Sequence, residues 1–389
     1  MDKTFRETVH RVELWVKEND YKGYDPFDVK GLHSLIWIQK NKYLRRAFNI
    51  VAEVFPIVIR RMCGVEGNRN AKAMGLFAKS YVTLFELTGD ETYKSEAMKC
   101  LNWLLENRNG EYQEYCWGYP FDWQSRILIP KDTPSAVVTS IVSDSFLAAF
   151  DVFDEEQWLD VAVHSCEFIV KRLNVFQKSG DQLCFSYTPL DTFRVHNANL
   201  LSAWILFKVG MKLSNHEFLE RAMQAVNYSV DEQNGDGSWY YWGNDTGGDR
   251  GVIDNFHTGF NLRSLHDIYL LRYDSRIEAS LVRGYEFFKN NLILDYSVPK
   301  YTKDHRYPID IHACAESILC LSVLSRTFRD AIGIAGKVGQ WTLNNMYNEK
   351  GYFYYRKYPL FTAKIPFIRW GQAWMMLALS EYLAATMKR

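Results

Sequence analysis

Three histidines stand at nearly constant spacing along the chain, each at the start of an apolar run with helical periodicity. They are His196, His257 and His312, and they are separated by 61 and 55 residues. Apolar side chains that recur every three or four residues predict helices packed on one side. The repeat therefore predicts a series of similar helical units with a polar side chain at one place in each, and such a polar rim favours a site.

The remaining periodicity extends this repeat along the chain and predicts an all-α (α/α)6 toroid of six helical hairpins. Five hairpins are expected, inner helix first, at 71–88 with 91–108, 134–153 with 155–173, 195–211 with 215–231, 256–273 with 276–292, and 310–327 with 329–346. The last helix, 367–386, has no successor. We expect it to close the ring by pairing with N-terminal helical material between residues 31 and 64, so that residues 1–389 form a single domain.

Charge and cysteine usage exclude several classes of partner. Basic and acidic residues both number 46, so no field of one sign favours nucleic acid. The seven cysteines are scattered without metal-ligand spacing, and we expect a reducing compartment, no metal and no cofactor. The N-terminus lacks a signal-peptide pattern, which indicates a cytoplasmic protein. Oligomeric state stays open.

The most membrane-like run, residues 47–59, is far shorter than the roughly 20 apolar residues that span a bilayer. It also carries Glu53 and Pro56. We interpret it as a buried helix with a proline bend and expect no membrane span.

Aromatic residues, 15% of the chain, gather in the long connections that lead from each outer helix to the next inner one. Long loops on one face of a ring are where function is usually found. Tyrosine and tryptophan beside polar groups are typical of sugar binding, because a pyranose stacks on the ring while its hydroxyls meet the polar neighbours. The same aromatics could instead form small cores within the loops.

Two segments carry a resemblance to a known group of proteins. They are Trp117-Gly-Tyr-Pro-Phe-Asp122-Trp123-Gln-Ser-Arg126 and Ile253-Asp-Asn-Phe-His257-Thr-Gly-Phe260. With the order of hairpins, they resemble the (α/α)6-toroid carbohydrate-active superfamily, which includes glycoside hydrolases, uronate polysaccharide lyases and the helical part of glucuronyl C5-epimerases. More narrowly, the chain is similar to proteins of prokaryotic cell-surface polysaccharide loci. The second histidine of an epimerase Asp-Tyr-His-Thr-Thr-His motif is absent here.

The candidate catalytic residues follow from this pattern. His257 stands at a helix start, where the helix dipole lowers an imidazole pKa and favours the neutral base. Asp254 just before it could be a catalyst or a helix cap. Asp122 lies among aromatics, which would raise its pKa, and near Arg126, which would lower it. His196 and Tyr241 complete the candidate catalytic set, and the candidate substrate-binding residues are Trp117, Tyr119, Trp123, Arg126, Asn197, Asn199, Trp239, Tyr240, His312, Arg369 and Trp370.

Two mechanisms and one non-catalytic role stay open. On an acidic oligosaccharide or polysaccharide, a lyase or epimerase would use Arg126, Arg369 or Asn199 to neutralise a uronate carboxylate, while His257 or Tyr241 takes the proton from C5. An inverting hydrolase would instead place two carboxylates such as Asp122 and Asp254 roughly 6.5–9.5 Å apart. A glycan-binding protein of polysaccharide biosynthesis would use the aromatic residues alone. We expect proton abstraction at C5 first and hydrolysis second.

Overall fold

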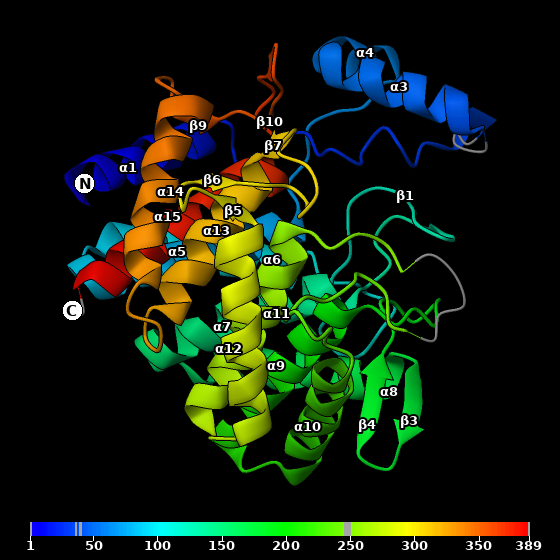
Figure 1. Cartoon of the computed structure of the whole chain (residues 1–389), viewed down its shortest axis with the longest axis vertical. Helices are drawn as coiled ribbons and strands as arrows, with labels where there is room; N and C mark the ends of the chain where they lie inside the picture. Colours follow the sequence, from blue (N-terminus) through cyan, green and yellow to red (C-terminus); the bar gives the residue numbers. More distant parts are fainter. Residues whose placement is uncertain (1, 36, 39–40, 245–249, 388–389) are drawn as a thin grey trace.

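The computed structural model describes residues 2–35, 37–38, 41–244 and 250–387. Inner helices lie at its centre (Figure 1), and their contacts close them into a ring. Each inner helix contacts the next, and the last contacts the first. These helices are α5 (Ala71–Thr88), α7 (Ala136–Phe153), α9 (His196–Leu213), α11 (Asn255–Leu271), α13 (Ile311–Leu324) and α15 (Trp374–Met387), the last preceded by a π-helical turn η2 (Ile368–Ala373). The predicted all-α toroid is confirmed, with inner boundaries close to those expected.

An outer helix packs against each inner helix. The outer helices are α6 (Glu91–Glu106), α8 (Glu156–Arg172), α10 (His216–Asp231), α12 (Ser275–Asn291), α14 (Ala331–Met346) and α1 (Asp2–Glu18). Short turns link inner to outer helices because Gly89 and Asp154 end α5 and α7 in the left-handed conformation. The side chains of Asp90, Asn215 and Asp274 then cap the next helix.

The expected partner of the last helix was wrong. The helix that packs on α15 is α1, and its apolar stripe of Phe5, Val9, Val12 and Val16 is fully buried. Residues 42–62 of the expected 31–64 segment form α3 (Lys42–Val54) and α4 (Pro56–Met62), which pack on each other at the edge of the molecule. A stripe of apolar residues with helical spacing predicts a helix, but it does not say which neighbour covers the stripe.

The run at residues 47–59 also differs from expectation. Pro56 does separate α3 from α4, as the proline bend predicted. The helices are exposed rather than buried, however, and Ile50 and Phe55 each have 57% of their surface open to solvent.

Short strands lie in the long loops at one end of the ring. Antiparallel pairs join β1 (Trp123–Gln124) to β2 (Leu128–Ile129), β3 (Val175–Ser179) to β4 (Gln182–Phe185), β5 (Ile293–Leu294) to β6 (Val298–Pro299), and β8 (Tyr347–Asn348) to β9 (Tyr352–Phe353). β10 (Arg356–Lys357) lies between β7 (Ile309–Asp310) and β11 (Thr362–Ala363), with Arg356 opposite Asp310 and Ala363. These pairings fix the loops above the inner helices.

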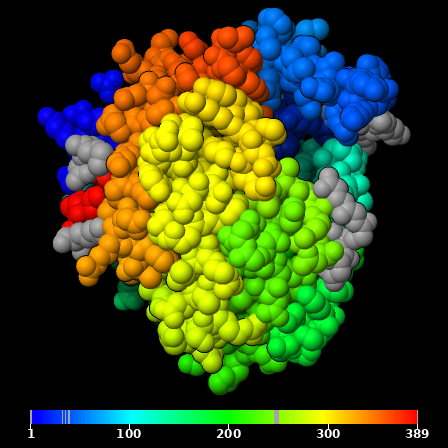
Figure 2. All heavy atoms as spheres, viewed as in Figure 1, coloured from blue at the N-terminus to red at the C-terminus, as the bar shows by residue number. Residues whose placement is uncertain are grey.

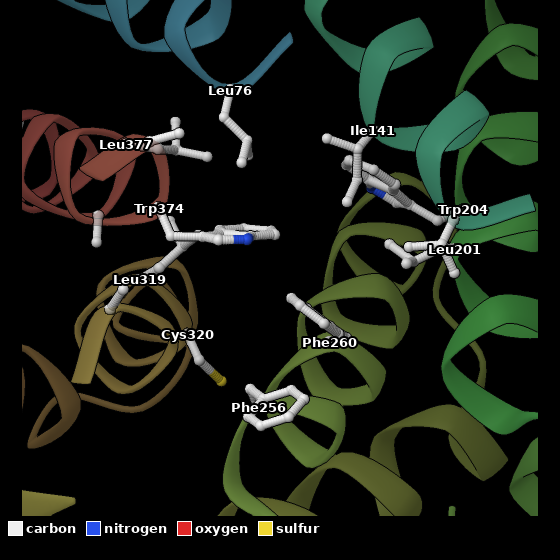
Figure 3. Close-up of a cluster of buried hydrophobic side chains, with 14 of the residues drawn as sticks. Leu76, Ile141, Leu201, Trp204, Phe256, Phe260, Leu319, Cys320, Trp374 and Leu377 are labelled. Atoms are coloured by element: carbon white, nitrogen blue, oxygen red, sulfur yellow. The ribbon is translucent and has the colours of Figure 1, made fainter. Parts of the chain in front are cut away.

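Side chains from the inner helices point toward the centre of the ring, where most of them line a cavity of about 810 Å³. Figure 3 shows them directed toward one another from α5, α7, α9, α11, α13 and α15: Leu76, Ile141, Leu201, Trp204, Phe260, Leu319, Trp374 and Leu377. Burial of each such side chain contributes about 1.5–3 kcal/mol. The one described helix that is long and apolar enough to cross a membrane by length and composition, α7, belongs to this ring, where 72% of it is buried.

A buried carboxylate links three of the inner helices. Asp144 of α7 is bridged by the ammonium groups of Lys79 on α5 and Lys208 on α9. Burial opposes its ionisation, but the two lysines outweigh burial and lower the pKa of Asp144 to about 2. The ionised carboxylate therefore stabilises the ring at neutral pH.

We expect Asp144→Asn to lower the free energy of unfolding by about 3 kcal/mol at pH 7, because two lysines lose their buried partner. A depressed folded pKa gives stability that is present above the unfolded value near 3.8 and lost as the pH falls toward 2. The difference between variant and wild type in urea unfolding should therefore shrink between pH 4 and pH 2. Asp151→Asn, which breaks the exposed pair with Lys212, is the matched control and should cost under about 1 kcal/mol. Equal losses in the two variants would contradict this account.

Candidate functional site

A cavity of about 180 Å³ lies at the end of the ring where the inner helices begin. Each inner unit contributes a residue from its first turn: Lys72, Val137, Asn197, His257, His312 and Arg369. The remaining walls are mostly aromatic and include Phe27, Tyr119, Phe121, Trp123, Tyr187, Tyr241, Phe256, Phe260, Tyr301 and Trp370. The repeated rim inferred from the histidine spacing therefore exists, and it surrounds an aromatic cavity.

His257 is held by the carboxylate that begins its own helix. Asp254 caps α11 by accepting a hydrogen bond from the backbone N–H of His257 at 2.9 Å, and its second oxygen accepts from Nδ1 of the same imidazole at 2.6 Å. Asp254 is buried, whereas a quarter of the His257 side chain is exposed. Because Nδ1 is engaged, Nε2 is the ring nitrogen left for chemistry. Asp254 is thus both a cap and the residue that orients His257.

Two further basic groups line the cavity, and neither forms an ion pair with a carboxylate in the part of the chain that the structure describes. His312 is buried, and neither of its ring nitrogens has a hydrogen-bond partner among the described residues. Its pKa lies well below the usual value because of burial and the nearby Lys72 and Arg369. The amine of Lys72 lies 5.6 Å from the ring centre of Phe260, and burial, with Arg369 nearby, places its pKa well below the ordinary value. Both groups are therefore neutral far more readily than their exposed counterparts.

One fixed positive charge remains at the cavity wall. Arg369 of η2 forms a two-point ion pair with Asp25, at 2.6 and 2.8 Å. Burial opposes its charge, but Asp25 outweighs burial and keeps the pKa of Arg369 above the ordinary value. Next to it, Trp370 donates its indole N–H to Asp310 at 2.8 Å, which fixes the indole against the cavity.

The tyrosines of the cavity are proton donors at neutral pH. Burial raises the pKa of Tyr119, Tyr187, Tyr241 and Tyr301 above the usual value. The ring of Tyr241 lies 4.5 Å from that of His257, centre to centre. A protonated hydroxyl on a buried tyrosine beside an imidazole can serve as the acid of an acid–base pair.

Carboxylates do not line this cavity among the residues that the structure describes. Three carboxylates are engaged behind its wall, Asp254 with His257, Asp25 with Arg369 and Asp310 with Trp370. No group of three or more histidine, cysteine or acidic side chains able to hold a metal ion occurs in the described part of the chain. The cavity offers neutral bases, hydroxyls and one guanidinium.

Eight of the residues predicted from the sequence line the cavity. They are Tyr119, Trp123, Asn197, Tyr241, His257, His312, Arg369 and Trp370, and Asp254 lies directly behind His257. The side-chain oxygen of Asn197 is buried and has no partner in the described structure. These residues come from four inner units and two long loops, as the toroid predicted.

Four other candidates are structural, which corrects the sequence-based assignment. Trp117 and Trp239 are buried and donate their indole N–H groups to the carbonyls of Leu104 and Ser229. Asn199 bonds to Phe185, Ala225 and Ser229. His196 lies 3.3 Å from the hydroxyl of Ser229, and burial lowers its pKa to about 3. Successive residues on a helix are rotated by about 100° about its axis. His196 and Asn199 therefore face the outer helix α10, while Asn197 faces the cavity.

Three candidates lie outside the cavity. Asp122 accepts a hydrogen bond from the backbone of Lys131 and lines a separate cavity of about 380 Å³. Arg126 stacks over Trp242, and Tyr240 carries the guanidinium of Arg250 on its ring. The carboxylate pair Asp122 and Asp254 expected for a hydrolase therefore does not meet at one site.

Sequence reasoning missed several residues of the wall, chiefly Lys72, Tyr187 and Tyr301. Lys72 stands in the first turn of α5, the place equivalent to His257 and His312 in their helices. The repeat alone could have identified it, had the search included lysine as well as histidine. The loop tyrosines carry no such positional signal.

Comparison with known proteins identifies the fold. No protein-family model matches the chain, and no curated protein matches it in sequence. Among solved structures, cellobiose 2-epimerase from Bacillus thermoamylovorans B4167 is similar at a TM-score of 0.64 and 10% identity, over 81% of this chain and 88% of that one. D-mannose isomerase gives 0.61 and 13%, over 81% and 87%. A heparin-specific unsaturated glucuronyl hydrolase gives 0.61 and 15%, over 82% and 87%. The chain therefore shares the (α/α)6-toroid fold of these solved structures.

Asn199 and Asn197 lie close together on α9 but have different roles, the first in packing and the second in the cavity. We expect Asn199→Ala to lower the free energy of unfolding by about 1–3 kcal/mol, because one donor (Phe185 N–H) and two acceptors (the Ala225 carbonyl and the Ser229 hydroxyl) lose their buried partner. Asn197→Ala should change stability little and instead weaken glycan binding, since its oxygen faces the cavity unpartnered. Urea unfolding and calorimetric titration with a glycan check the pair, and a reversal of the two effects would contradict the assignment.

Proposed function

We propose that this protein is a carbohydrate epimerase or lyase that removes a proton from a sugar carbon next to a carboxylate, with C5 of a uronate residue as the reacting centre. The observation that supports this most strongly is the pair of His257 and Asp254 at an aromatic cavity whose described wall holds no carboxylate. An imidazole poised by a buried carboxylate is a general base. The solved structures of the same fold are named for sugar isomerisation, epimerisation and hydrolysis.

Proton removal begins at Nε2 of His257. Asp254 accepts from Nδ1, which fixes the tautomer with the lone pair on Nε2 and stabilises the imidazolium formed when the proton arrives. The aromatic walls exclude water from the reacting carbon, and Trp123 and Trp370 offer flat faces to a sugar ring. The same contacts position the substrate carbon against the base.

The negative charge that develops on the substrate needs a cation or hydrogen-bond donors. Arg369 lines the cavity and is held rigidly by Asp25, so a substrate carboxylate can face a preorganised guanidinium. Lys72 enters with a depressed pKa, and an approaching carboxylate would favour its charged form. Both groups therefore interact more strongly with the anionic intermediate than with a neutral sugar.

The fate of that intermediate distinguishes epimerase from lyase. Tyr241 is protonated and lies against His257. If its hydroxyl returns a proton to the opposite face of C5, the configuration inverts. If it protonates the oxygen at C4 instead, the glycosidic bond at C4 breaks and an unsaturated uronate forms. Both reactions use the same base and the same wall.

A second candidate function is epimerisation or isomerisation at C2 of a reducing sugar. It is favoured by one observation, the pairing of Arg369 with Asp25, because the carboxylate behind the wall offsets the charge of the guanidinium. A neutral substrate with an aldehyde would then suit the cavity, and two of the similar solved structures are named for cellobiose 2-epimerase and D-mannose isomerase. Hydrolysis is the weaker alternative, because Asp122 and Asp254 do not share a cavity.

The test is proton exchange in deuterium oxide with a panel of uronate-containing oligosaccharides, glucose, mannose and cellobiose. We expect deuterium at C5 of a uronate or a new ultraviolet absorbance from an unsaturated product, and a fall of about 10²–10⁴ in His257→Asn because the general base is lost. His216→Asn removes an exposed histidine on α10 and should leave the rate unchanged.

Each outcome of this panel is informative. Deuterium at C2 of a neutral sugar would transfer the assignment to the second candidate. Water addition without exchange would favour hydrolysis, and glycan binding without any turnover would favour a non-catalytic binding protein. Hydrolysis, or binding without turnover, would overturn proton abstraction as the function.

Replacement of the supporting carboxylate is the sharper test of mechanism. Asp254→Asn keeps a side chain that caps a helix as well as aspartate does, yet its neutral amide cannot stabilise the imidazolium. We expect kcat to fall about 10²–10⁴-fold with KM and the urea midpoint nearly unchanged. A loss of stability with kcat preserved would show that Asp254 serves only as the cap of α11.

A further inference from the structure

Helices α3 and α4, residues 42–62, form an arm at the edge of the toroid. Figure 1 shows the arm, in blue, apart from the ring of helices, and Figure 2 shows it as a lobe at the border of the molecule. The arm contacts the loops of the long-loop end through Glu53, which pairs with Arg356 at 2.8 Å and accepts from the hydroxyl of Tyr358. It thus lies on the same end of the toroid as the cavity.

The arm is amphipathic, and its apolar side faces solvent. Tyr43, Ala47, Ile50 and Val54 follow one another at helical spacing along α3 and are all exposed. The large apolar side chains open to solvent on the arm are Tyr43, Leu44, Ile50, Val51, Val54, Phe55, Ile57, Val58 and Met62, with exposed fractions from 42% to 80%. An apolar area of this extent on a protein surface marks a binding surface.

The other side of the arm faces the protein. Ala52 and Arg60 are buried there, and Glu53 is paired with Arg356. Arg60 binds the carboxylate of Asp28 and donates to the backbone carbonyl of Asp25 at 2.7 Å. These ion pairs hold the arm with its apolar stripe outward, so the exposure is specified by named contacts.

The arm also concentrates positive charge. Residues 42–62 contain the basic residues Lys42, Arg45, Arg46, Arg60 and Arg61 and the single acidic residue Glu53, in a chain with no net charge. Lys42, Arg45, Arg46 and Arg61 are exposed beside the apolar stripe, whereas Glu53 is turned inward and paired. The exposed arm therefore presents apolar side chains flanked by cations.

We propose that the arm binds the surface of an anionic phospholipid bilayer. A helix with an apolar face and flanking lysine and arginine lies in the membrane interface, with its apolar side among the acyl chains and its cations at the anionic headgroups. This is attachment to one leaflet, and no part of the arm spans the bilayer. The cavity would then be held close to the membrane surface.

A second copy of this chain is a weaker occupant of the same surface. A twofold-symmetric contact places the same patch on both partners. The cations beside the stripe of one protomer would then share the contact with those of the other, and like charges brought together destabilise it. An anionic lipid surface is complementary to the same cations.

The test is flotation of the full chain with vesicles of phosphatidylcholine alone or with 30% phosphatidylglycerol. We expect binding to the anionic vesicles that weakens with salt. Ile50→Asp/Val54→Asp should weaken it at least tenfold, because two charges enter the inserted stripe. Leu271→Asp/Val282→Asp is the matched control, with two exposed aliphatic side chains away from the arm and the same change in charge, and it should bind as the wild type does.

Arg45→Gln/Arg46→Gln tests the electrostatic part. Each basic residue at an anionic surface strengthens binding about fivefold, so the double variant should bind roughly 25-fold more weakly and with less salt dependence. A polarity-sensitive dye on Cys63, which ends α4 and is the one partly exposed cysteine of seven, should shift its emission to the blue on the anionic vesicles.

Two outcomes would overturn the proposal. The first is a wild type that does not bind anionic vesicles. If light scattering then shows the wild type to be a dimer and Ile50→Asp/Val54→Asp to be a monomer, the arm binds a second copy of the chain. The other is equal vesicle binding by the arm variants and the control. Urea midpoints close to that of the wild type establish that each variant is folded.

Discussion

The geometry of the site depends on one constraint, the parallel arrangement of the inner helices in a closed ring. Because every inner helix begins at the same end, their N-terminal dipoles all converge on one cavity. Converging positive dipole ends stabilise an anion at the centre of the cavity. This effect suits the anionic intermediate of the proposed reaction, and it requires no unusual residue beyond those in the first turn of each helix.

The buried ion pairs around the cavity complete this electrostatic arrangement. Asp25 binds Arg369, Asp310 binds Arg356, and Glu316 binds Arg263, so the strongest charges are matched in pairs behind the wall. Lys72 and His312 are left in the wall with depressed pKa values. Among the described residues, this wall does not hold the two carboxylates that an inverting hydrolase needs. Its charges are compatible with the proton transfer proposed above.

The helices and half of the site could be predicted from the sequence because both follow the 3.6-residue period. His257, His312 and Asn197 reach the cavity since each stands in the first turn of an inner helix. Within that turn, however, a shift of one residue rotates a side chain by about 100°, and the period does not resolve whether His196 or Asn197 faces inward. Trp117 and Trp239 show the second limit. An aromatic loop residue becomes core or wall according to where its indole N–H finds a carbonyl, and that partner is distant in the sequence.

The arm shows a third limit of prediction from sequence, because an apolar stripe with the same helical spacing can be buried in the protein or exposed to solvent. The stripe of Phe5, Val9, Val12 and Val16 on α1 and the stripe of Tyr43, Ile50 and Val54 on α3 have the same helical spacing, yet the first is buried and the second is exposed. What distinguishes them is the charge beside the stripe. Acidic and basic residues are mixed along α1, whereas the exposed charges of α3 are all basic and its one acid is paired inward. A single-sign border is expected of a helix that meets an anionic surface, and charge pattern therefore carries information that periodicity does not.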